Sequence, residues 1–600
     1  MFRCEISRHI WDTRYRFRDG ERVIDQTIDD TWWRISRALA GAESQDRETW
    51  AGRFHAVLAG FRFLPGGRIQ AGAGTGRQVT LFNCFVMGRV EDSIDGIFDA
   101  LKEGALTMQQ GGGVGYDFST LRPAGSRART VGTVASGPVP FMRIWDAMCA
   151  TVLSTGARRG AMMATLRVDH PDIVSFVEAK REGGQLRHFN LSVLVPDAFM
   201  EAVRRDEAWP LVFPVQGADG AGEIVERRWS GDVSPVPCRV LARIGARDLW
   251  NRIMRAAYHS AEPGVLFVDR INRLNNLHYR ENISATNPCG EIPLPYYGAC
   301  DLGSINLTAF VEDPFSRDAR FDFDAFRDAV VLAVRMLDDA VDVSGFPLPA
   351  QREQARGTRR IGLGITGLAD AMIMLGHRYG DDGSLAFARE IMRALCHRAY
   401  RTSIDLALEK GAFPYFERDA YLSGEFVRML PADIRDGIAS RGIRNSHLVA
   451  IAPTGTISLL ANNVSSGLEP VFDVDYTRRI VDASGEGREY AITDFACRLW
   501  RELKGPHVPL PDTFMNARSL APDVHLAAQA ALAPYVDSAI SKTVNVPRDL
   551  PFGEFESLYL DAFGLGLKGC TTFRANPVTG EVLSSVIDAK HCCSIEREAD

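Results

Sequence analysis

An amide, a thiol and a carboxylate occupy alternate positions near the start of the segment NPCGEIPLPYYGACDLGSINL, residues 287–307. They belong to Asn287, Cys289 and Glu291. In an extended loop, side chains two residues apart point the same way, so these three groups would face one pocket. A buried cysteine in a turn rich in proline and glycine explains the same spacing, and on spacing alone it is the commoner explanation.

Two further cysteines are Cys84, in the short apolar run LFNCFV, and Cys300, in GACDLGS. The chain has eleven cysteines. An odd number without a signal peptide argues against a secreted disulfide scaffold, and no paired CxxC or HExxH spacing predicts a metal site built by the protein. Two thiols can form a disulfide only if their Cα atoms come within about 7 Å, a geometric demand that the sequence leaves open.

A possible anion site lies in IAPTGTISLL, residues 451–460. A strand, a loop of small residues and the start of a helix favour phosphate binding, because backbone N–H groups and the helix dipole face the anion. The hydroxyl groups there belong to Thr454, Thr456 and Ser458. Taken alone, the stretch is more simply an ordinary helix cap rich in threonine and serine.

Two glycine patterns are weak signals. GLGITG at 362–367 matches GxGxxG, but it follows GTRRI rather than a clear apolar strand, so dinucleotide binding is not expected there. QQGGGVGYDF at 109–118 lacks the GK[ST] of a phosphate-binding P-loop.

The elements that would position these groups alternate between strand and helix, which favours an α/β architecture with a substantially parallel sheet. Residues 1–80 are expected to be mainly helical, and the sequence becomes polar after Pro577. The segment 94–109 fits an amphipathic helix capped by Asp92 or Ser93. Other helices are expected at 246–258 and 325–341, and strands at 188–196 and 447–452.

The bulk composition describes a globular protein of several structural units. The 600 residues are 46% apolar and 24% charged, with a net charge of −7. This mild acidity does not indicate a nucleic-acid-binding surface. No run is long and apolar enough to span a bilayer and the N-terminus is no signal peptide, so the expected location is the cytoplasm.

The motifs together resemble ribonucleotide reductases over almost the whole chain. The resemblance is carried, in order, by FRFLPGGRI, LFNCFV, TMQQGGGVGYDFSTLRP, RRGAMMATLRVDHPDI, NPCGEI, APTGTIS and GLKGCTTFR. It implies an α/β barrel of ten strands in two parallel five-stranded halves, with Cys289 on a central finger loop. The expected division is a helical region at 1–80 without an ATP-cone domain, a catalytic barrel at 81–577 and a flexible tail at 578–600.

The resemblance also implies the catalytic roles. Cys289 would form a thiyl radical that abstracts the 3′ hydrogen, with Glu291 as the base on the 3′-hydroxyl and Asn287 orienting the sugar. Cys84 and Cys300 would supply two electrons and a proton for the departing 2′-hydroxyl and become a disulfide. The residues implied in substrate binding are Asn83, Ser119 and the diphosphate loop of Pro453, Thr454, Gly455, Thr456, Ile457 and Ser458.

Regulation is implied at Asp92 and the segments 125–133 and 154–165, which resemble the sites of dNTP or ATP specificity effectors. The arginines concerned are Arg127, Arg158 and Arg159. Paired arginines suit phosphate or base contacts, although solvated surface arginines are commoner. Such effector loops are built across a dimer interface in most of the family, so a homodimer is expected. Without an ATP cone, overall control by ATP and dATP is not expected.

The radical source is indicated by Thr571 and Thr572, which stand where reductases with a separate radical subunit carry a tyrosine pair. Threonine cannot relay an electron hole, so the resemblance favours adenosylcobalamin. The cobalamin motif DxHxxG is absent; LGHRYG at 375–380 comes nearest.

Ribonucleoside diphosphates are the expected substrates. The alternatives are a reductase that receives its radical from a metal subunit and a non-catalytic nucleotide-binding regulator. The tail cysteines, Cys592 and Cys593, would pass electrons from a thioredoxin- or glutaredoxin-like reductant, although the family usually separates such cysteines by spacer residues.

Overall fold

The computed structural model describes residues 1–126, 134–154, 158–181, 185–215, 222–481 and 487–574. In these ranges no helix has the length and apolar character needed to cross a membrane.

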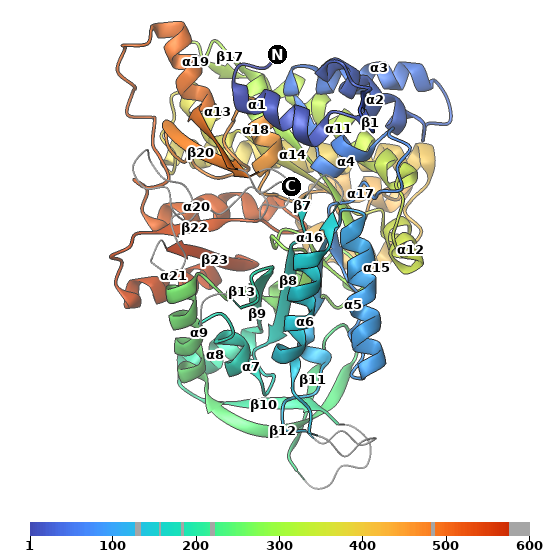
Figure 1. Cartoon of the computed structure of the whole chain (residues 1–600), viewed down its shortest axis with the longest axis vertical. Helices are drawn as coiled ribbons and strands as arrows, with labels where there is room; N and C mark the ends of the chain where they lie inside the picture. Colours follow the sequence, from blue (N-terminus) through green and yellow to red (C-terminus); the bar gives the residue numbers. More distant parts are fainter. Residues whose placement is uncertain (127–133, 155–157, 182–184, 216–221, 482–486, 575–600) are drawn as a thin grey trace.

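The N-terminal region is mainly helical, as expected, and lies at one end of the molecule (Figure 1). Helix α2 begins at a capping box in which the Thr27 hydroxyl accepts from the Asp30 N–H and the Asp30 carboxylate accepts from the Thr27 N–H. Its apolar face buries Trp32 and Ile35 completely. The helices are α1 (Glu5–Ile10), a π-helical turn (Trp11–Tyr15), α2 (Ile28–Ala40), α3 (Arg47–Leu58) and α4 (Gly67–Gly72), with a short hairpin of β1 (Arg18–Asp19) and β2 (Arg22–Val23).

A ten-stranded sheet forms the centre of the molecule, in the order β19-β16-β4-β5-β8-β9-β13-β23-β22, with β3 also pairing β16. The strands are β3 (Phe63–Pro65), β4 (Cys84–Val86), β5 (Gly113–Asp117), β8 (Met162–Arg167), β9 (Phe189–Val195), β13 (Gly264–Phe267), β16 (Ala299–Asn306), β19 (Ile361–Thr366), β22 (Thr543–Val546) and β23 (Gly569–Arg574).

The pairing divides this sheet into parallel groups. Strands β4, β5, β8, β9 and β13 pair parallel with one another. Pairing is also parallel between β16 and β19 and between β22 and β23. The groups meet through the antiparallel contacts β4–β16 and β13–β23. The expectation of a mixed α/β fold with a large, mostly parallel sheet is therefore confirmed, although the ten strands include β3, which is antiparallel to β16.

Helices cover the sheet and lie between its strands in the sequence (Figure 1). They are α5 (Ile94–Gln109), α6 (Pro138–Thr151), α7 (Ile173–Val177), α8 (Asp197–Arg205), α9 (Ala246–Ser260), α10 (Val268–Arg273), α11 (Phe323–Val343), α12 (Pro349–Thr358), α13 (Leu368–Met374), α14 (Asp382–Lys410), α15 (Arg418–Ser423), α16 (Glu425–Met429), α17 (Ala432–Arg441), α18 (Gly455–Leu460), α19 (Phe495–Lys504), α20 (Pro522–Leu532) and α21 (Phe552–Gly564).

Smaller sheets and hairpins complete the fold. The three-stranded β10-β12-β11 sheet lies at the end of the molecule away from the N-terminal helices (Figure 1). Its strands are β10 (Ala208–Pro214), β11 (Ile224–Arg228) and β12 (Pro235–Gly245), and the hairpins are β6–β7 (Leu153–Ser154, Arg158–Arg159), β14–β15 (Ala285–Thr286, Pro293–Leu294), β17–β18 (Val311–Glu312, Arg320–Phe321) and β20–β21 (Asp475–Val481, Gly487–Thr493).

The helices expected at 94–109, 246–258 and 325–341 are confirmed as α5, α9 and α11. The cap of α5 is Ser93, whose hydroxyl accepts from the Gly96 N–H at 3.1 Å. The strand expected at 188–196 is β9, but both of its faces are largely buried, since it is an inner strand of the sheet.

The stretch 447–452 forms isolated bridges rather than a regular strand. Val449 bridges Leu363 in parallel, and Ile451 bridges Ile540 in parallel. The first five residues of the neighbouring GLGITG sequence lie in β19, and Gly367 is the N-cap of α13. A Cβ on Gly364 would lie only 2.4 Å from the Ala450 carbonyl oxygen, so glycine permits the 447–452 segment to approach β19 closely.

Candidate active site

The finger loop closes the short hairpin of β14 and β15, in which Thr286 pairs with Pro293. Asn287 makes two hydrogen bonds across the loop to Ile292. Its backbone N–H donates to the Ile292 carbonyl at 3.2 Å, and its side-chain Oδ1 accepts from the Ile292 N–H at 3.0 Å. Gly290 has φ of +84°, a left-handed conformation that glycine adopts without a steric penalty. The loop is therefore held in one conformation by its own side chain and a required glycine.

The amide and carboxyl of this loop converge on Cys84. Asn287 Nδ2 donates to Cys84 Sγ at 3.2 Å, and Cys84 Sγ donates to Glu291 Oε1 at 3.8 Å. Asn287 and Glu291 are fully buried, and Cys84 is buried to the same degree. Two of the three loop groups, those of Asn287 and Glu291, thus contact the Cys84 thiol. The third, Cys289, is partly exposed.

Cys84 and Cys300 face each other across two antiparallel strands. They are direct register partners in the β4–β16 pair, and both are buried free thiols. Opposed residues in antiparallel strands have Cα atoms roughly 4.5–5.5 Å apart. Disulfides span roughly 4.4–6.8 Å between Cα atoms, so the backbone needs no rearrangement to bring these thiols into bonding range.

Burial sets the protonation of this cluster. It raises the pKa of Glu291 to about 7, although hydrogen bonds from Asn287 and Cys84 lower it in part. Glu291 Oε2 is buried and has no hydrogen-bond partner among the described residues. Burial also raises the pKa of Cys84 and of Cys300 well above the usual range, and the nearby carboxyls of Glu291 and Asp301 respectively add to the rise. Both thiols therefore carry their protons at neutral pH.

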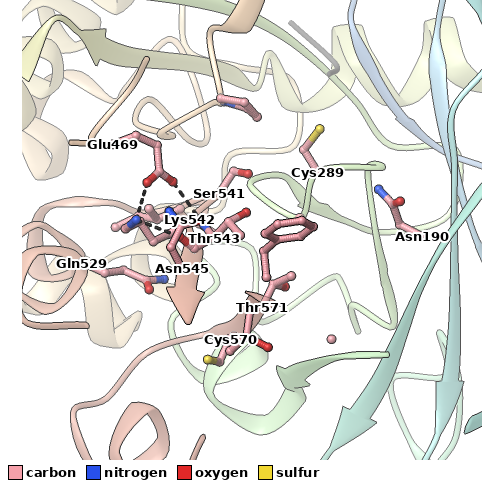
Figure 2. A pocket seen from close by; sticks show the side chains of 18 of the residues that line it. Asn190, Cys289, Glu469, Gln529, Ser541, Lys542, Thr543, Asn545, Cys570 and Thr571 are labelled. Carbon is pink, nitrogen blue, oxygen red and sulfur yellow. Dashed lines mark hydrogen bonds and ion pairs between the residues drawn. The ribbon is translucent and has the colours of Figure 1, made fainter. Parts of the chain in front are cut away.

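A cleft of about 1960 Å³ lies beside the finger loop, and Cys289 lines it together with Pro288 and Gly290. Figure 2 shows Cys289 on one side of this cleft and Cys570 and Thr571, from β23, on another. The volume is about twice the upper end of ordinary small-molecule pockets, which run to roughly 1,000 Å³. The cleft thus has room for more than one ligand next to the exposed thiol.

The proposed phosphate loop reaches this cleft through Pro453 and Ser458. Thr454 begins α18 with φ of +56°, and its Oγ1 accepts from the Gly467 N–H at 2.8 Å and lies 3.0 Å from Thr366 Oγ1. The Thr454 hydroxyl therefore holds the loop in place. The backbone N–H groups in the first turn of α18, beginning with Gly455, have no hydrogen-bond acceptors within the helix and can donate to a bound anion.

Comparison with known proteins agrees with this site. A family model described as ribonucleotide reductase, barrel domain, matches residues 82–573, and one described as ribonucleotide reductase, all-alpha domain, matches residues 1–78. The chain belongs to the ribonucleotide reductases.

Among the similar reductases is the vitamin B12-dependent ribonucleoside-diphosphate reductase of Mycobacterium tuberculosis, which is 38% identical over 95% of this chain and 79% of that protein. The enzyme of the same name from Thermoplasma acidophilum is 34% identical over 89% of this chain and 66% of that protein. The ribonucleoside-diphosphate reductase large subunit of vaccinia virus is 30% identical over 69% of this chain and 55% of that protein.

The other substrate residues expected for a reductase lie near the site but do not line the cleft. The Asn83 carbonyl accepts from the Gly113 N–H at 2.8 Å, next to Cys84 on β4. The Ser119 hydroxyl accepts from the Arg167 N–H at 2.9 Å and is fully buried. Both therefore support strands of the reductase sheet in this structure.

Of the expected effector groups, the structure describes the side chain of Asp92. The Asp92 carboxylate accepts from Arg122 Nε at 2.7 Å and from the Arg122 N–H at 3.1 Å. Arg158 and Arg159 form strand β7, and Arg127 lies outside the described residues. Of the segment 154–165, residues 162–165 belong to the buried strand β8.

Thr571 and Thr572, which the resemblance placed at the position of a tyrosine pair, lie on β23. Thr572 is buried, and its hydroxyl lies 3.0 Å from that of Tyr559 on α21. The tail thiols Cys592 and Cys593 lie outside the described residues. No group of three or more metal-ligating side chains is found in the part of the chain that the structure describes.

Sequence reasoning missed two groups that shape the reductase cleft. Asn190 Nδ2 donates to the Pro288 carbonyl at 2.7 Å and so supports the finger loop from β9. Its position as the polar residue in the strand HFNLSVLVP was an available signal. The second group is the ion pair on the cleft wall between the buried Lys542 and the partly exposed Glu469, and residues this far apart in sequence carry no shared motif.

Proposed function

We propose that this chain reduces ribonucleoside diphosphates to 2′-deoxyribonucleotides and that Cys289 carries the thiyl radical. One observation supports the proposal most strongly. Cys84 and Cys300 are opposed on β4 and β16, and Cys84 contacts both Asn287 and Glu291 of the loop that carries Cys289. A reductant pair, a base and a radical thiol thus belong to one connected cluster.

The steps balance with these groups alone. The Cys289 thiyl removes the 3′ hydrogen, and the Glu291 carboxylate accepts the 3′-hydroxyl proton, as a general base within hydrogen-bond reach would. The 2′-hydroxyl leaves as water after taking a proton from one thiol of the Cys84–Cys300 pair, and the hydrogen of the other thiol goes to C2′. These thiols give up two electrons and become a disulfide. The 3′ hydrogen then returns from Cys289, which regenerates its radical, and Glu291 returns the proton to the 3′-oxygen.

Adenosylcobalamin is the cofactor, consistent with the names of the most similar reductases and with threonine at 571 and 572. When bound, it supplies the organic radical that converts the Cys289 thiol to a thiyl. The residues present fit so bulky a group, because small side chains line the cleft where β23 and α20 meet it. Those that would hold it are Gly569, Thr571, Ala530 and Ala533.

We also propose that the central sheet closes into a barrel of two five-stranded halves. The bridges Leu363–Val449 and Ile451–Ile540 support closure, since they link β19 through 447–452 to the segment that becomes β22. The division into 1–80, 81–577 and a tail at 578–600 is supported by the family matches at 1–78 and 82–573.

The remaining assignments concern ligands and partners. The first turn of α18 would bind the substrate diphosphate, with Asn83 and Ser119 close to the sugar. Effector nucleotides would bind near Asp92 in a homodimer, and Cys592 and Cys593 would transfer electrons from a thioredoxin- or glutaredoxin-like protein in the cytoplasm. Displacement of Arg122 from the Asp92 carboxylate would accompany effector binding.

The test is one assay of the purified chain with adenosylcobalamin, a dithiol and either CDP or CTP. Formation of dCDP without any second protein is expected. Activity only after an iron or manganese subunit is added would overturn the radical assignment. Reduction of CTP but not CDP would overturn the diphosphate assignment alone.

A further inference from the structure

The phosphate loop, residues 453–458, is held in place by the segment that follows α18. Thr454 Oγ1 accepts from the Gly467 N–H at 2.8 Å and lies 3.0 Å from the Thr366 hydroxyl. That hydroxyl donates to the Ser465 carbonyl at 2.9 Å. The conformation of the phosphate loop therefore depends on where Ser465 lies.

Ser465 is fixed in turn by Asp370 on α13. The Asp370 carboxylate accepts from the Ser465 N–H at 2.6 Å, and the Ser465 hydroxyl accepts from the Asp370 N–H at 3.3 Å. The other oxygen of the carboxylate accepts from the Ala496 N–H at 2.9 Å. Since Ala496 lies in the first turn of α19, Asp370 joins this helix to the segment that holds the phosphate loop.

A second carboxyl group is hydrogen-bonded to that of Asp370. It belongs to Asp494, the N-cap of α19, whose Oδ2 accepts from the Cys497 N–H at 3.2 Å. Asp370 is 0% exposed and Asp494 is 3% exposed. Two ionised carboxylates have no hydrogen to share, so this contact requires a proton on one of them.

The surroundings favour retention of that proton. Burial raises the pKa of Asp494 well above its usual range, and the neighbouring Asp370 carboxyl adds to the rise. In the part of the chain that the structure describes, neither carboxyl forms an ion pair with a lysine, arginine or histidine. The titratable and charged side chains that face the pair are those of Tyr476 and Arg478 on β20 and of Cys497 and Arg498 on α19.

We propose that Asp370 and Asp494 are positioning residues for the substrate diphosphate and share one proton, which Asp494 donates to Asp370. The shared proton keeps Asp370 in contact with Ser465, and through Ser465 it keeps the phosphate loop in its binding conformation. Neither carboxyl needs to touch the nucleotide. The inference rests on the assignment of residues 453–458 to the diphosphate.

Loss of the proton would act against the diphosphate in two ways. Two adjacent carboxylates repel each other, so Asp370 would separate from Asp494 and release Ser465. The additional negative charge would also face an anionic ligand, since Asp494 lines the same cleft as Ser458. Because the pKa is raised in the folded chain, the contribution of the pair is present at acidic and neutral pH and is lost as the pH rises.

The first experiment measures binding of CDP and of inorganic pyrophosphate by calorimetry at a series of pH values. In the wild-type chain both ligands should bind more weakly as the pH rises above neutrality. Asp494→Asn supplies an N–H donor at every pH, so it should bind both ligands within about threefold of wild type at pH 7 and lose this alkaline weakening.

Two further variants complete the comparison. Asp494→Leu removes the donor, so the dissociation constant for CDP should rise about tenfold at pH 7, the effect of one hydrogen bond to a charged group. Asp473→Asn is the matched control, because Asp473 also lines the cleft but its carboxylate accepts from the adjacent Val474 N–H at 2.8 Å. It should keep the affinity of the wild-type chain and its alkaline weakening.

Turnover separates positioning from a general structural role. Asp494→Leu should raise KM for CDP about tenfold and leave kcat within about twofold, because the pair acts on the bound diphosphate and not on the thiols. A lower kcat at unchanged KM would overturn the inference, as would alkaline weakening in Asp494→Asn equal to that of wild type. If Asp494→Leu fails to fold by circular dichroism, the pH series of Asp494→Asn decides alone.

The proposed function fails separately, because binding is measured without turnover. A wild-type chain that binds CDP with the expected pH dependence but forms no dCDP would refute the proposed function and leave the inference standing. A chain that forms dCDP but binds CDP and pyrophosphate equally well at neutral and alkaline pH would refute the inference alone.

Discussion

The finger-loop cluster and the effector region are built in opposite ways. Asn287, Glu291 and Cys84 are buried and already in contact, with Cys300 opposed to Cys84 by strand register. The Asp92 carboxylate, in contrast, is partly exposed and bound to Arg122. The groups proposed for reduction are thus in contact within one chain, whereas the proposed binding of an effector at Asp92 would require displacement of Arg122. Substitutions in the first region should act on turnover, and those in the second on regulation.

The largest effect is expected for Cys289→Ser. The O–H bond is too strong to be broken in place of the S–H bond, so deoxynucleotide formation should fall to background while nucleotide binding stays within about twofold. Product is measured by chromatography and binding by calorimetry. Appreciable multiple turnover by this variant would assign the radical to another residue.

Glu291→Gln should lower turnover by about 10²- to 10⁴-fold, the usual contribution of a general base. Since burial raises the pKa of Glu291 to about 7, wild-type turnover should increase as the pH rises through 7, and the residual activity of the variant should lack that rise. A pH–rate profile with the same limb in both proteins would contradict the assignment.

The same carboxyl should affect stability. Its pKa is higher in the folded than in the unfolded chain, so its stabilising contribution is present at acidic pH and is lost as the pH rises through about 7. Glu291→Gln should therefore raise the melting temperature more at pH 8 than at pH 5. A larger gain at pH 5 would contradict a buried carboxyl with a raised pKa.

The sequence predicted which residues belong to this site better than it predicted which of them contact one another. NPCGE identified the loop, but the opposition of Cys84 and Cys300 depends on pairing between strands far apart in the chain. GLGITG matches a dinucleotide-binding pattern, yet residues 361–366 form strand β19, in which Gly364 admits the backbone at Ala450.

A more selective effect is expected in the tail. Cys592→Ser/Cys593→Ser should keep most activity with dithiothreitol, which can diffuse to the buried pair. The variant should lose activity with thioredoxin, which would pass electrons to that pair through an intermediary thiol by thiol–disulfide exchange. A single-turnover burst from pre-reduced protein should survive. Normal turnover with thioredoxin would exclude the tail, and Cys570, which lines the cleft, would be the next thiol to replace.

The smallest effect on basal turnover is expected for Asp92→Asn. The variant should reduce CDP within about twofold of wild type without effector, since the Asp92 carboxylate binds Arg122, which lies outside the finger-loop cluster. Its response to dNTPs, measured as the ratio of CDP to ADP reduction, should weaken. An unchanged ratio across all dNTPs would place the effector elsewhere.

The most direct measurement of the central claim is a single turnover without external reductant. Pre-reduced chain, adenosylcobalamin and CDP are mixed, quenched with an alkylating agent and examined by mass spectrometry alongside the product. The account predicts one Cys84–Cys300 disulfide for each dCDP formed in Cys592→Ser/Cys593→Ser protein. Product formed with both thiols still alkylated, or with the disulfide between other cysteines, would contradict it.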